Sequence, residues 1–248
     1  MPLSDEEKRT EEAAAAWAKV GANKNKIAAS YTCKERFPAE ENPVAIFMAG
    51  SPGAGKTETS IEMLKALDPQ QRVVRIDADE LRQFVPGYNG ANSYLFHRAV
   101  SILVERILDK AFANKQSFIL DGTLSKLDIA KKNIDRALRK KRFVVIVYVY
   151  MDPLLAWDFV QKRETVEGRR IEREVFIEQF FSAQTVVNQL KAIYGSKIRV
   201  MLFHKDIDRT VAYKDNISKI DSHIAQKYTR ESLREALNKL DQGLDETR

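Results

Sequence analysis

The chain is poor in the residues that build disulfides and transition-metal sites. Its 248 residues include one cysteine, Cys33, and three histidines. A single cysteine excludes an internal disulfide, and so few Cys and His residues leave no cluster with the spacing of a zinc site. We therefore expect a protein of a reducing compartment, the cytoplasm.

Long apolar runs are missing as well. The longest apolar segment, residues 143–151, is far too short to span a bilayer, which takes about 20 residues. The first residues are acidic and contain no apolar stretch of the kind found in a secretion signal. These features predict neither export nor insertion into a membrane.

Glycine and proline are sparse, with ten and seven residues, and 44% of the chain is hydrophobic. This composition is sufficient for one large α/β domain with a complete core. Lysine and arginine outnumber aspartate and glutamate by 41 to 35, which gives a net charge of +6 and a pI near 9.2. Because the excess is spread along the chain, it suits an anionic ligand such as a nucleotide.

One stretch carries a nucleotide-binding signature. An apolar run at residues 44–49 leads into eight residues that match G-x-x-x-x-G-K-[S/T], and a helical pattern follows. These residues are Gly50, Ser51, Pro52, Gly53, Ala54, Gly55, Lys56 and Thr57. The glycines of such a loop let successive backbone N–H groups point at a phosphate, and the helix N-terminus adds its positive dipole end. The pattern predicts a polyphosphate site.

Two side chains complete the predicted site. Lys56 is expected to reach the β- and γ-phosphates of ATP as a compact charge. The Thr57 hydroxyl is expected to coordinate a Mg²⁺ ion that keeps several of its waters. The alternative, an ordinary glycine turn, is disfavoured by the strand and the helix on either side.

Strands and helices are predicted to alternate through the centre of the chain. The strands are expected at residues 44–49, 72–76, 117–120, 143–150 and 198–203, with helices at 58–67, 92–114, 126–139, from 153, and at 174–194. The continuous Val/Ile/Tyr run at residues 143–150 indicates burial on both faces and hence a parallel sheet. The alternation predicts a doubly wound α/β fold, with a mainly parallel sheet flanked by helices.

Two extensions are expected around a central domain at residues 43–205. Residues 1–42 are predicted to be helical, with a capping box at Ser4 and Glu7 and a break at Gly21. They form either a helical layer packed on the sheet or a docking surface for a partner protein. Residues 206–248 are predicted to be a helical extension of the same domain, ending in an amphipathic helix at 229–240.

Acidic residues follow two of the predicted strands. Asp77 and Asp79 end the strand at residues 72–76, and Asp121 closes the strand at 117–120. The carboxyl ends of parallel strands face the ligand crevice, and phosphoryl transfer to a hydroxyl needs a carboxylate that accepts its proton. Other roles stay open. Asp77 can bond backbone or a Mg²⁺-bound water, Asp79 can cap a helix that starts at Glu80, and Asp121 can bind Mg²⁺ or substrate.

Arginines are concentrated at residues 163–173, a stretch that is placed to close over ATP as a lid. Guanidinium groups there would stabilise charge on the moving phosphoryl group. Arg163 and Arg169 are the candidates for this role. Arg170 and Arg173 are expected to be solvent-exposed or ion-pair residues.

These motifs, in this order and spacing, resemble the zeta toxin family, bacterial kinases that phosphorylate UDP-N-acetylglucosamine. The resemblance covers about residues 43–205. It rests on the glycine loop and on residues 76–82, 120–123 and 163–174. It implies a P-loop NTPase-type fold, an ATP- and Mg²⁺-dependent kinase that acts on the 3′-hydroxyl of a UDP-sugar, and the toxin of a toxin–antitoxin pair with an inhibitor protein as partner.

Family roles, carried onto matching positions, imply that Asp79 accepts the proton of the substrate hydroxyl. The implied substrate contacts are Asp77, Glu105, Asp121 and Thr123, and the implied phosphate contacts are Lys56, Arg163 and Arg169. Without the resemblance, Glu105 would be interpreted as a solvated charge on a helix. Two positions depart from the family. Asp121 stands where a Glu is expected before Gly-Thr, and Asn133 falls near a substrate-binding Thr.

Other functions remain as alternatives. A P-loop kinase of this kind can act on an antibiotic, a dinucleotide or an RNA 5′ end, although the basic residues 126–142 lack the interleaved aromatics that stack bases, which makes nucleic acid unlikely as a partner. A non-catalytic nucleotide switch is a further alternative, because Asn238 to Asp241 match the N-K-x-D pattern that binds guanine in GTPases. That match lies in a predicted helix rather than after a strand, and we interpret it as coincidence.

Overall fold

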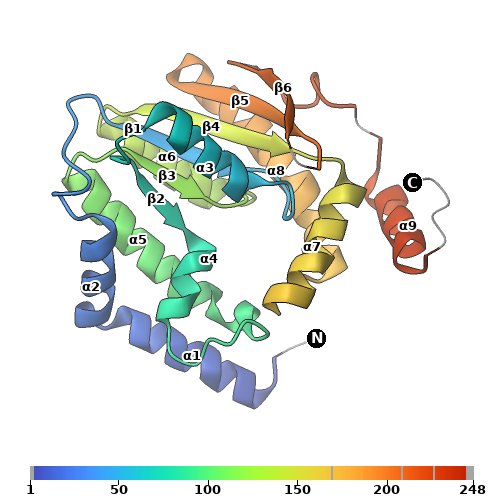
Figure 1. Cartoon of the computed structure of the whole chain (residues 1–248), viewed down its shortest axis with the longest axis horizontal. Helices are drawn as coiled ribbons and strands as arrows, with labels where there is room; N and C mark the ends of the chain where they lie inside the picture. The colour runs from blue at the N-terminus through green and yellow to red at the C-terminus, as the bar shows by residue number, and fades with distance from the viewer. Residues whose placement is uncertain (1–2, 169, 208, 226, 244–248) are drawn as a thin grey trace.

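The sheet at the centre of the molecule confirms the predicted α/β class. The computed structural model describes residues 3–168, 170–207, 209–225 and 227–243, and their strands form one six-stranded sheet in the order β2-β3-β1-β4-β5-β6 (Figure 1). The strands are β1 (Val44–Ala49), β2 (Val74–Asp77), β3 (Phe118–Asp121), β4 (Phe143–Tyr150), β5 (Ile198–Lys205) and β6 (Thr210–Lys214). β1 to β5 pair in parallel, and β6 runs antiparallel to β5.

Helices cover both faces of the sheet (Figure 1). They are α1 (Asp5–Lys19), α2 (Gly21–Tyr31), α3 (Lys56–Leu67), α4 (Ala78–Leu81), α5 (His97–Ala113), α6 (Leu127–Arg139), α7 (Pro153–Glu167), α8 (Arg173–Tyr194) and α9 (Arg230–Asp241). Short 3₁₀ turns lie at Arg82–Phe84, Ser93–Phe96 and Gly195–Lys197. The predicted helix at residues 92–114 is therefore a 3₁₀ turn followed by α5.

Two hydrophobic clusters hold the layers together, one on each face of the sheet. Alternation along the central strands separates them: Phe47 and Ile146 belong to the cluster that includes α5 and α6, whereas Met48 and Val147 belong to the cluster that includes α3, α7 and α9. Both faces of β4 are buried, which explains why its apolar residues are continuous rather than alternating.

The N-terminal helices form a layer, and the predicted capping box is present. The Glu7 backbone N–H donates to Ser4 Oγ at 3.2 Å, and the Ser4 N–H donates to Glu7 Oε2 at 2.6 Å. α1 packs on α5 and on the Ser93–Phe96 turn, where the Tyr94 hydroxyl donates to Glu7. The layer therefore rests mainly on α5, and α2 also contacts the edge strand β2.

The segment after residue 205 is not wholly helical, which corrects one expectation. It adds β6 to the sheet through a hairpin with β5 before it reaches α9. The sequence pattern did not predict this strand because four of its five residues are exposed, so it has no buried face to mark in the sequence.

The helix α9 is fastened to α7 and α8 by one carboxylate. Asp241 accepts hydrogen bonds from Trp157 Nε1 at 3.0 Å and from Gln161 Nε2 at 2.7 Å, both on α7. Arg173, at the start of α8, pairs with Asp241 and also donates to Asn238. The N-K-x-D match thus binds a guanidinium of its own chain, which supports its interpretation as coincidence.

We expect Asp241→Ala to lower the free energy of unfolding by about 1–3 kcal/mol, because it leaves the partly buried Arg173 and the buried Trp157 N–H without their acceptor. Glu178→Ala is the matched control, since it removes a carboxylate that is 62% exposed and pairs with Arg230. Chemical denaturation of both variants measures the difference. Equal losses would show that Asp241 contributes no more to holding α9 than the exposed ion pair between Arg230 and Glu178 does.

Candidate active site

The glycine loop adopts a backbone that only glycine permits at two of its positions. Gly50 and Gly53 have φ angles of 135° and 74°. A Cβ on Gly50 would lie 2.3 Å from the carbonyl oxygen of Val149 at the end of β4, and one on Gly53 would lie 2.1 Å from that of Ala156 on α7. The loop therefore packs closely between β4 and α7, and a side chain at either position would clash with their backbone and displace the loop.

Lys56 is the first residue of α3 and lies against the loop. Its ammonium donates to the carbonyl oxygen of Ser51 at 2.6 Å. Burial lowers the pKa of Lys56 to about 8, against the opposing effect of the negative charges on Asp121 and Asp79. The positive charge of Arg163 lowers the pKa further. The structure thus brings Asp79, Asp121 and Arg163 within electrostatic reach of Lys56.

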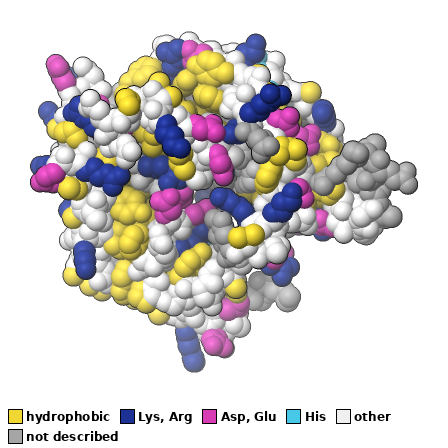
Figure 2. Space-filling view, viewed as in Figure 1, with side chains coloured by type: hydrophobic (Ala, Val, Ile, Leu, Met, Phe, Trp, Pro, Cys, Tyr) yellow, Lys and Arg dark blue, Asp and Glu magenta, His cyan; other side chains and the backbone are white. Residues whose placement is uncertain are grey.

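Acidic and basic side chains gather around the centre of one face of the molecule (Figure 2). This region lies where the parallel strands end, between α4 and α7 (Figure 1). The carboxyl edge of a parallel sheet is where such folds bind ligands. The surface charges and the glycine loop therefore mark the same side of the sheet.

Arg75 on β2 connects three carboxylates. Its guanidinium donates to Asp77 at 2.6 Å, to Asp121 at 3.0 Å and to Glu80 at 2.6 Å. Its Nε donates to Ser60 Oγ on α3 at 3.1 Å. Burial alone would lower the pKa of Arg75, but the hydrogen bond to Glu80 and the neighbouring carboxylates raise it, so the guanidinium stays charged.

Asp77 and Asp79 lie in different secondary-structure elements, whereas the sequence predicts both at the end of one strand. Asp77 is the last residue of β2 and caps α4, because its Oδ1 accepts the Asp79 backbone N–H at 2.8 Å. Asp79 lies within α4, so it is neither on the strand nor the cap of a helix that starts at Glu80. The position of Asp79 at the strand end and its role as a helix cap are thereby corrected, and its role as a proton acceptor stays a prediction. The side-chain alternation of a strand does not apply to the pair.

The two carboxylates also differ electrostatically. Burial raises the pKa of Asp77, and the charges of Asp121 and Asp79 raise it further, whereas the Asp79 N–H and Arg75 oppose this. The Asp79 carboxylate is 38% exposed and forms an ion pair with Arg82, whose side chain is 7% exposed. Asp77 is therefore a buried structural carboxylate, and Asp79 is the one that solvent or a ligand can reach.

Thr123 lies beside the glycine loop, and Glu105 lies between two helices. The Thr123 carbonyl accepts the Gly50 N–H at 3.3 Å, and its hydroxyl is 3.1 Å from Ser125 Oγ. Glu105, on α5, pairs with Lys132 at 3.0 Å and with Arg136 at 3.1 Å, both on α6. Both carboxylate oxygens of Glu105 thus bind α6.

The predicted lid arginines have separate environments. Arg163 lies on α7, not in a loop, and its charge acts on Lys56. Arg169 lies outside the described residues. Arg170 is 3.6 Å from Glu172 in an exposed ion pair, and Arg173 binds α9, so both are ion-pair residues, as expected.

The donors near Lys56 fit a magnesium ion that is held mainly by phosphate oxygens. Thr57 and Ser60 are one turn apart on α3 and therefore lie on the same side of the helix. The Ser60 hydroxyl is 3.3 Å from Asp121 Oδ2, so the Asp121 carboxylate faces this side of α3 as well. Both are hard oxygen donors, which Mg²⁺ prefers. Within the described ranges, no group of three or more His, Cys, Asp or Glu side chains is placed to hold a metal ion by itself.

Sequence reasoning missed the roles of two arginines, Arg75 and Arg82. Arg75 precedes Asp77 by two residues, so the period of a strand places both on one face. Arg82 follows Asp79 by three residues, a spacing that brings side chains together in a helix. Both spacings are visible in the sequence, but the assignment of Asp79 to a helix is needed to use the second.

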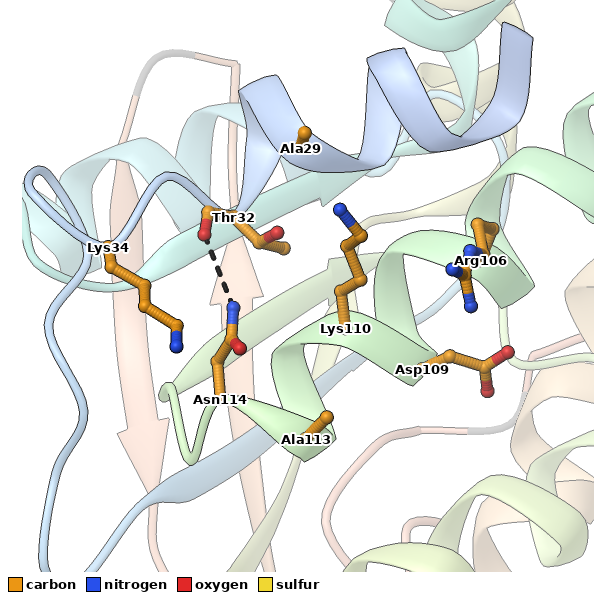
Figure 3. A pocket seen from close by; sticks show the side chains of 8 residues that line it. All are labelled: Ala29, Thr32, Lys34, Arg106, Asp109, Lys110, Ala113 and Asn114. Atoms are coloured by element: carbon orange, nitrogen blue, oxygen red, sulfur yellow. Dashed lines mark hydrogen bonds between the residues drawn. The ribbon is translucent and has the colours of Figure 1, made fainter. Parts of the chain in front are cut away.

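A separate pocket of about 450 Å³ lies between the end of α2 and α5 (Figure 3). Lys34, Arg106 and Lys110 line it, and Asn114 Nδ2 is 3.4 Å from the Thr32 carbonyl oxygen across one side. Its residues come from the outer helical layer, and none of them belongs to the cluster around Lys56.

No helix in the described part of the chain is both long and apolar enough to cross a membrane.

A known toxin is similar in sequence to part of this chain. Toxin PezT of Streptococcus pneumoniae serotype 4 (strain ATCC BAA-334 / TIGR4) is 27% identical over 126 residues, 48% of this chain and 49% of that protein. The match thus spans about half the length of the curated relative.

Solved structures share the fold. A structure from the PezAT chromosomal toxin–antitoxin system of Streptococcus pneumoniae superposes with a TM-score of 0.65 at 17% identity, over 99% of both chains. A chain of the AvrRxo1-ORF1:-ORF2 complex with ATP gives a TM-score of 0.53 at 18% identity, over 84% of this chain and 65% of that one.

The family model described as Zeta toxin matches residues 27–218, which is well over half of the 248 residues. The match includes the glycine loop, the Arg75 cluster, α7 and the strands β1 to β6. It confirms the resemblance on which the residue roles depend. The chain belongs to the zeta toxin family.

Proposed function

We propose that this protein is an ATP-dependent kinase that phosphorylates the 3′-hydroxyl of a UDP-sugar, UDP-N-acetylglucosamine. The observation that carries the proposal is the convergence on Lys56 of Asp79, Asp121 and Arg163 beside a phosphate-binding loop. A phosphoryl transfer site needs this combination of cations for the phosphates and a carboxylate for the acceptor. Family membership and the structural likeness to a complex with ATP support it.

The loop and two cations bind and polarise the triphosphate. Backbone N–H groups of residues 50–57 and the N-terminus of α3 hold the phosphate oxygens. Lys56 leaves the Ser51 carbonyl and binds between the β- and γ-phosphates, while Arg163 reaches the γ-phosphate from α7, and Arg169 is proposed to do the same. A bound Mg²⁺ ion, held by Thr57 and Asp121, would neutralise phosphate charge.

Asp79 is proposed as the general base. The acceptor oxygen attacks the γ-phosphorus, the bond between that phosphorus and the β,γ-bridging oxygen breaks, and the acceptor proton passes to a carboxylate oxygen of Asp79. Asp79 suits this role better than Asp77 because it is accessible, whereas Asp77 is engaged by Arg75 and by the backbone of α4. Thr123 and Glu105 are proposed to contact the acceptor, and Asp77 is proposed to shape the acceptor site through Arg75 and α4.

An inhibitor protein is the proposed partner, and the cytoplasm is the proposed location. The solved relatives come from a toxin–antitoxin system and from the ORF1:ORF2 complexes of AvrRxo1. A kinase that consumes a sugar nucleotide needs ATP, which the cytoplasm supplies. A partner that covers the glycine loop and Asp79 would block both substrates.

The acceptor is tested by incubating the protein with labelled ATP, Mg²⁺ and a panel of UDP-sugars, NAD, an aminoglycoside and RNA with a 5′-hydroxyl. We expect UDP-N-acetylglucosamine to be labelled fastest. Faster labelling of NAD, the antibiotic or RNA would identify another acceptor and keep the kinase assignment. Hydrolysis of nucleotide with no labelled acceptor would favour the switch alternative.

Asp79→Asn is expected to reduce the rate of transfer by about a hundredfold or more while ATP binding stays near that of the wild type, because asparagine keeps the shape and loses the proton acceptor. Single-turnover kinetics and equilibrium ATP binding measure the two effects. Asp77→Asn is the matched control, and its main effect is expected on the stability of the Arg75 cluster. A larger rate loss for Asp77→Asn, with both variants folded, would transfer the base role to Asp77.

ATP binding should take up protons near pH 8. The pKa of Lys56 is about 8 in the free protein, so about half of the ammonium groups are neutral at that pH. Bound phosphates favour the charged form and raise this pKa, so binding draws about half a proton from solution at pH 8 and weakens as the pH rises further. Calorimetry in buffers of different ionisation enthalpy measures this uptake.

Lys56→Arg provides the control, because an arginine stays charged at every pH tested. Its ATP binding should show no proton uptake at pH 8. A wild-type protein that also binds ATP without proton uptake would contradict a lowered pKa for Lys56.

A further inference from the structure

Lys205 is a buried lysine beside the phosphate loop, and none of the roles described above involves it. It is the last residue of β5, at the same carboxyl edge of the sheet as the glycine loop. Its side chain is 5% exposed. A Cβ built on Gly55 would lie 3.4 Å from Lys205 Cε and 3.7 Å from Cδ, so the methylene chain packs directly over the loop.

The backbone is irregular at this position. The pairing of β5 with β6 shifts register between His204 and Lys205. Such irregularities change the direction of a side chain and are common next to functional sites. The side chain of Lys205 is therefore directed by a local feature of the strand and not only by the alternation that places Met201 and Phe203 on this face.

Within the described ranges, the ion pair of Lys205 is long and partly solvated. Oε2 of Glu62, on α3, is 3.7 Å from Nζ, and the Glu62 side chain is 57% exposed. A solvated carboxylate at this distance contributes little, while burial of an ammonium group is costly. A closer anion would explain why a charged side chain is kept here.

We propose that Lys205 binds the α-phosphate of the nucleotide and so determines affinity for the triphosphate. The location favours the α-phosphate over the γ-phosphate. Lys205 packs against Gly55, and the Glu58 carboxylate lies 3.8 Å from the same point on Gly55, so Lys205 lies at the part of the loop where α3 begins. Loops of this kind hold the α- and β-phosphates through their backbone N–H groups, and Lys56 binds the β- and γ-phosphates. The ammonium of Lys205 then exchanges its long contact with Glu62 for a phosphate oxygen.

The test is Lys205→Met, which keeps the methylene chain over Gly55 and removes the charge. We expect it to raise the dissociation constants of ATP and of inorganic tripolyphosphate by the same factor, about tenfold or more, the scale of one charge-assisted hydrogen bond. The maximal rate of transfer at saturating ATP should change little. Lys214→Met, on the exposed strand β6, is the matched control and should bind both ligands as the wild type does.

Salt dependence separates a phosphate contact from a structural role. With one cation fewer in the site, ATP binding by Lys205→Met should fall less steeply with KCl concentration than wild-type binding does. A weaker variant with the wild-type salt dependence would overturn the proposal, as would unchanged ATP affinity or a variant that does not fold. A loss of ATP affinity without a loss of tripolyphosphate affinity would overturn it in favour of a contact with the ribose or base.

The inference rests on the proposed nucleotide binding, and Lys56→Ala keeps the two failures apart. If wild-type protein binds neither ATP nor tripolyphosphate, the proposed function fails. If wild-type protein binds both and Lys56→Ala has lost them while Lys205→Met has not, the role of Lys205 alone is wrong.

Discussion

The balance of charge around Lys56 is the constraint on which the rest of the site depends. Asp77 and Asp121 end neighbouring parallel strands in register, and Asp79 follows within two residues, so three carboxylates are crowded at one edge of the sheet. Arg75 neutralises the buried pair, and Arg82 pairs with the third. Without these guanidinium groups, the negative charges of the carboxylates would repel one another. The charges of Asp121 and Asp79 in turn oppose the effect of burial on the pKa of Lys56.

Local features of the site were predictable from sequence, and features that depend on pairing between distant segments were not. The strand, glycine loop and helix at residues 44–67 are contiguous, so one pattern contains their geometry. The contact between Arg75 and Asp121 joins residues 46 apart, and it depends on β2 lying beside β3. The position of Asp79 was predicted wrongly because the helix α4 has only four residues, too few for a periodic signal.

The same distinction applies to the region that would cover ATP. The charged residues at 163–173 predicted a lid. They did not predict that α9, near the end of the chain, contacts the helices on both sides of this segment. Asp241 binds α7 through Trp157 and Gln161, and it binds α8 through Arg173. The two helices that the segment connects are therefore held to each other through α9. Arg163 extends from the same helix as Trp157. Its distance from the loop is therefore set by the packing of α7, and α9 supports that packing.

The hydrogen bond from Lys56 to the Ser51 carbonyl joins the buried ammonium to its own loop. A buried ammonium needs an acceptor, and the loop offers its own carbonyl oxygen. Phosphate oxygens replace this bond with stronger, charge-assisted ones, so the net gain on binding is the difference between the two. Burial has already lowered the pKa of Lys56, and a bound anion restores it. The proposed binding of a triphosphate agrees with this, because a highly charged ligand offsets the cost of keeping this lysine desolvated.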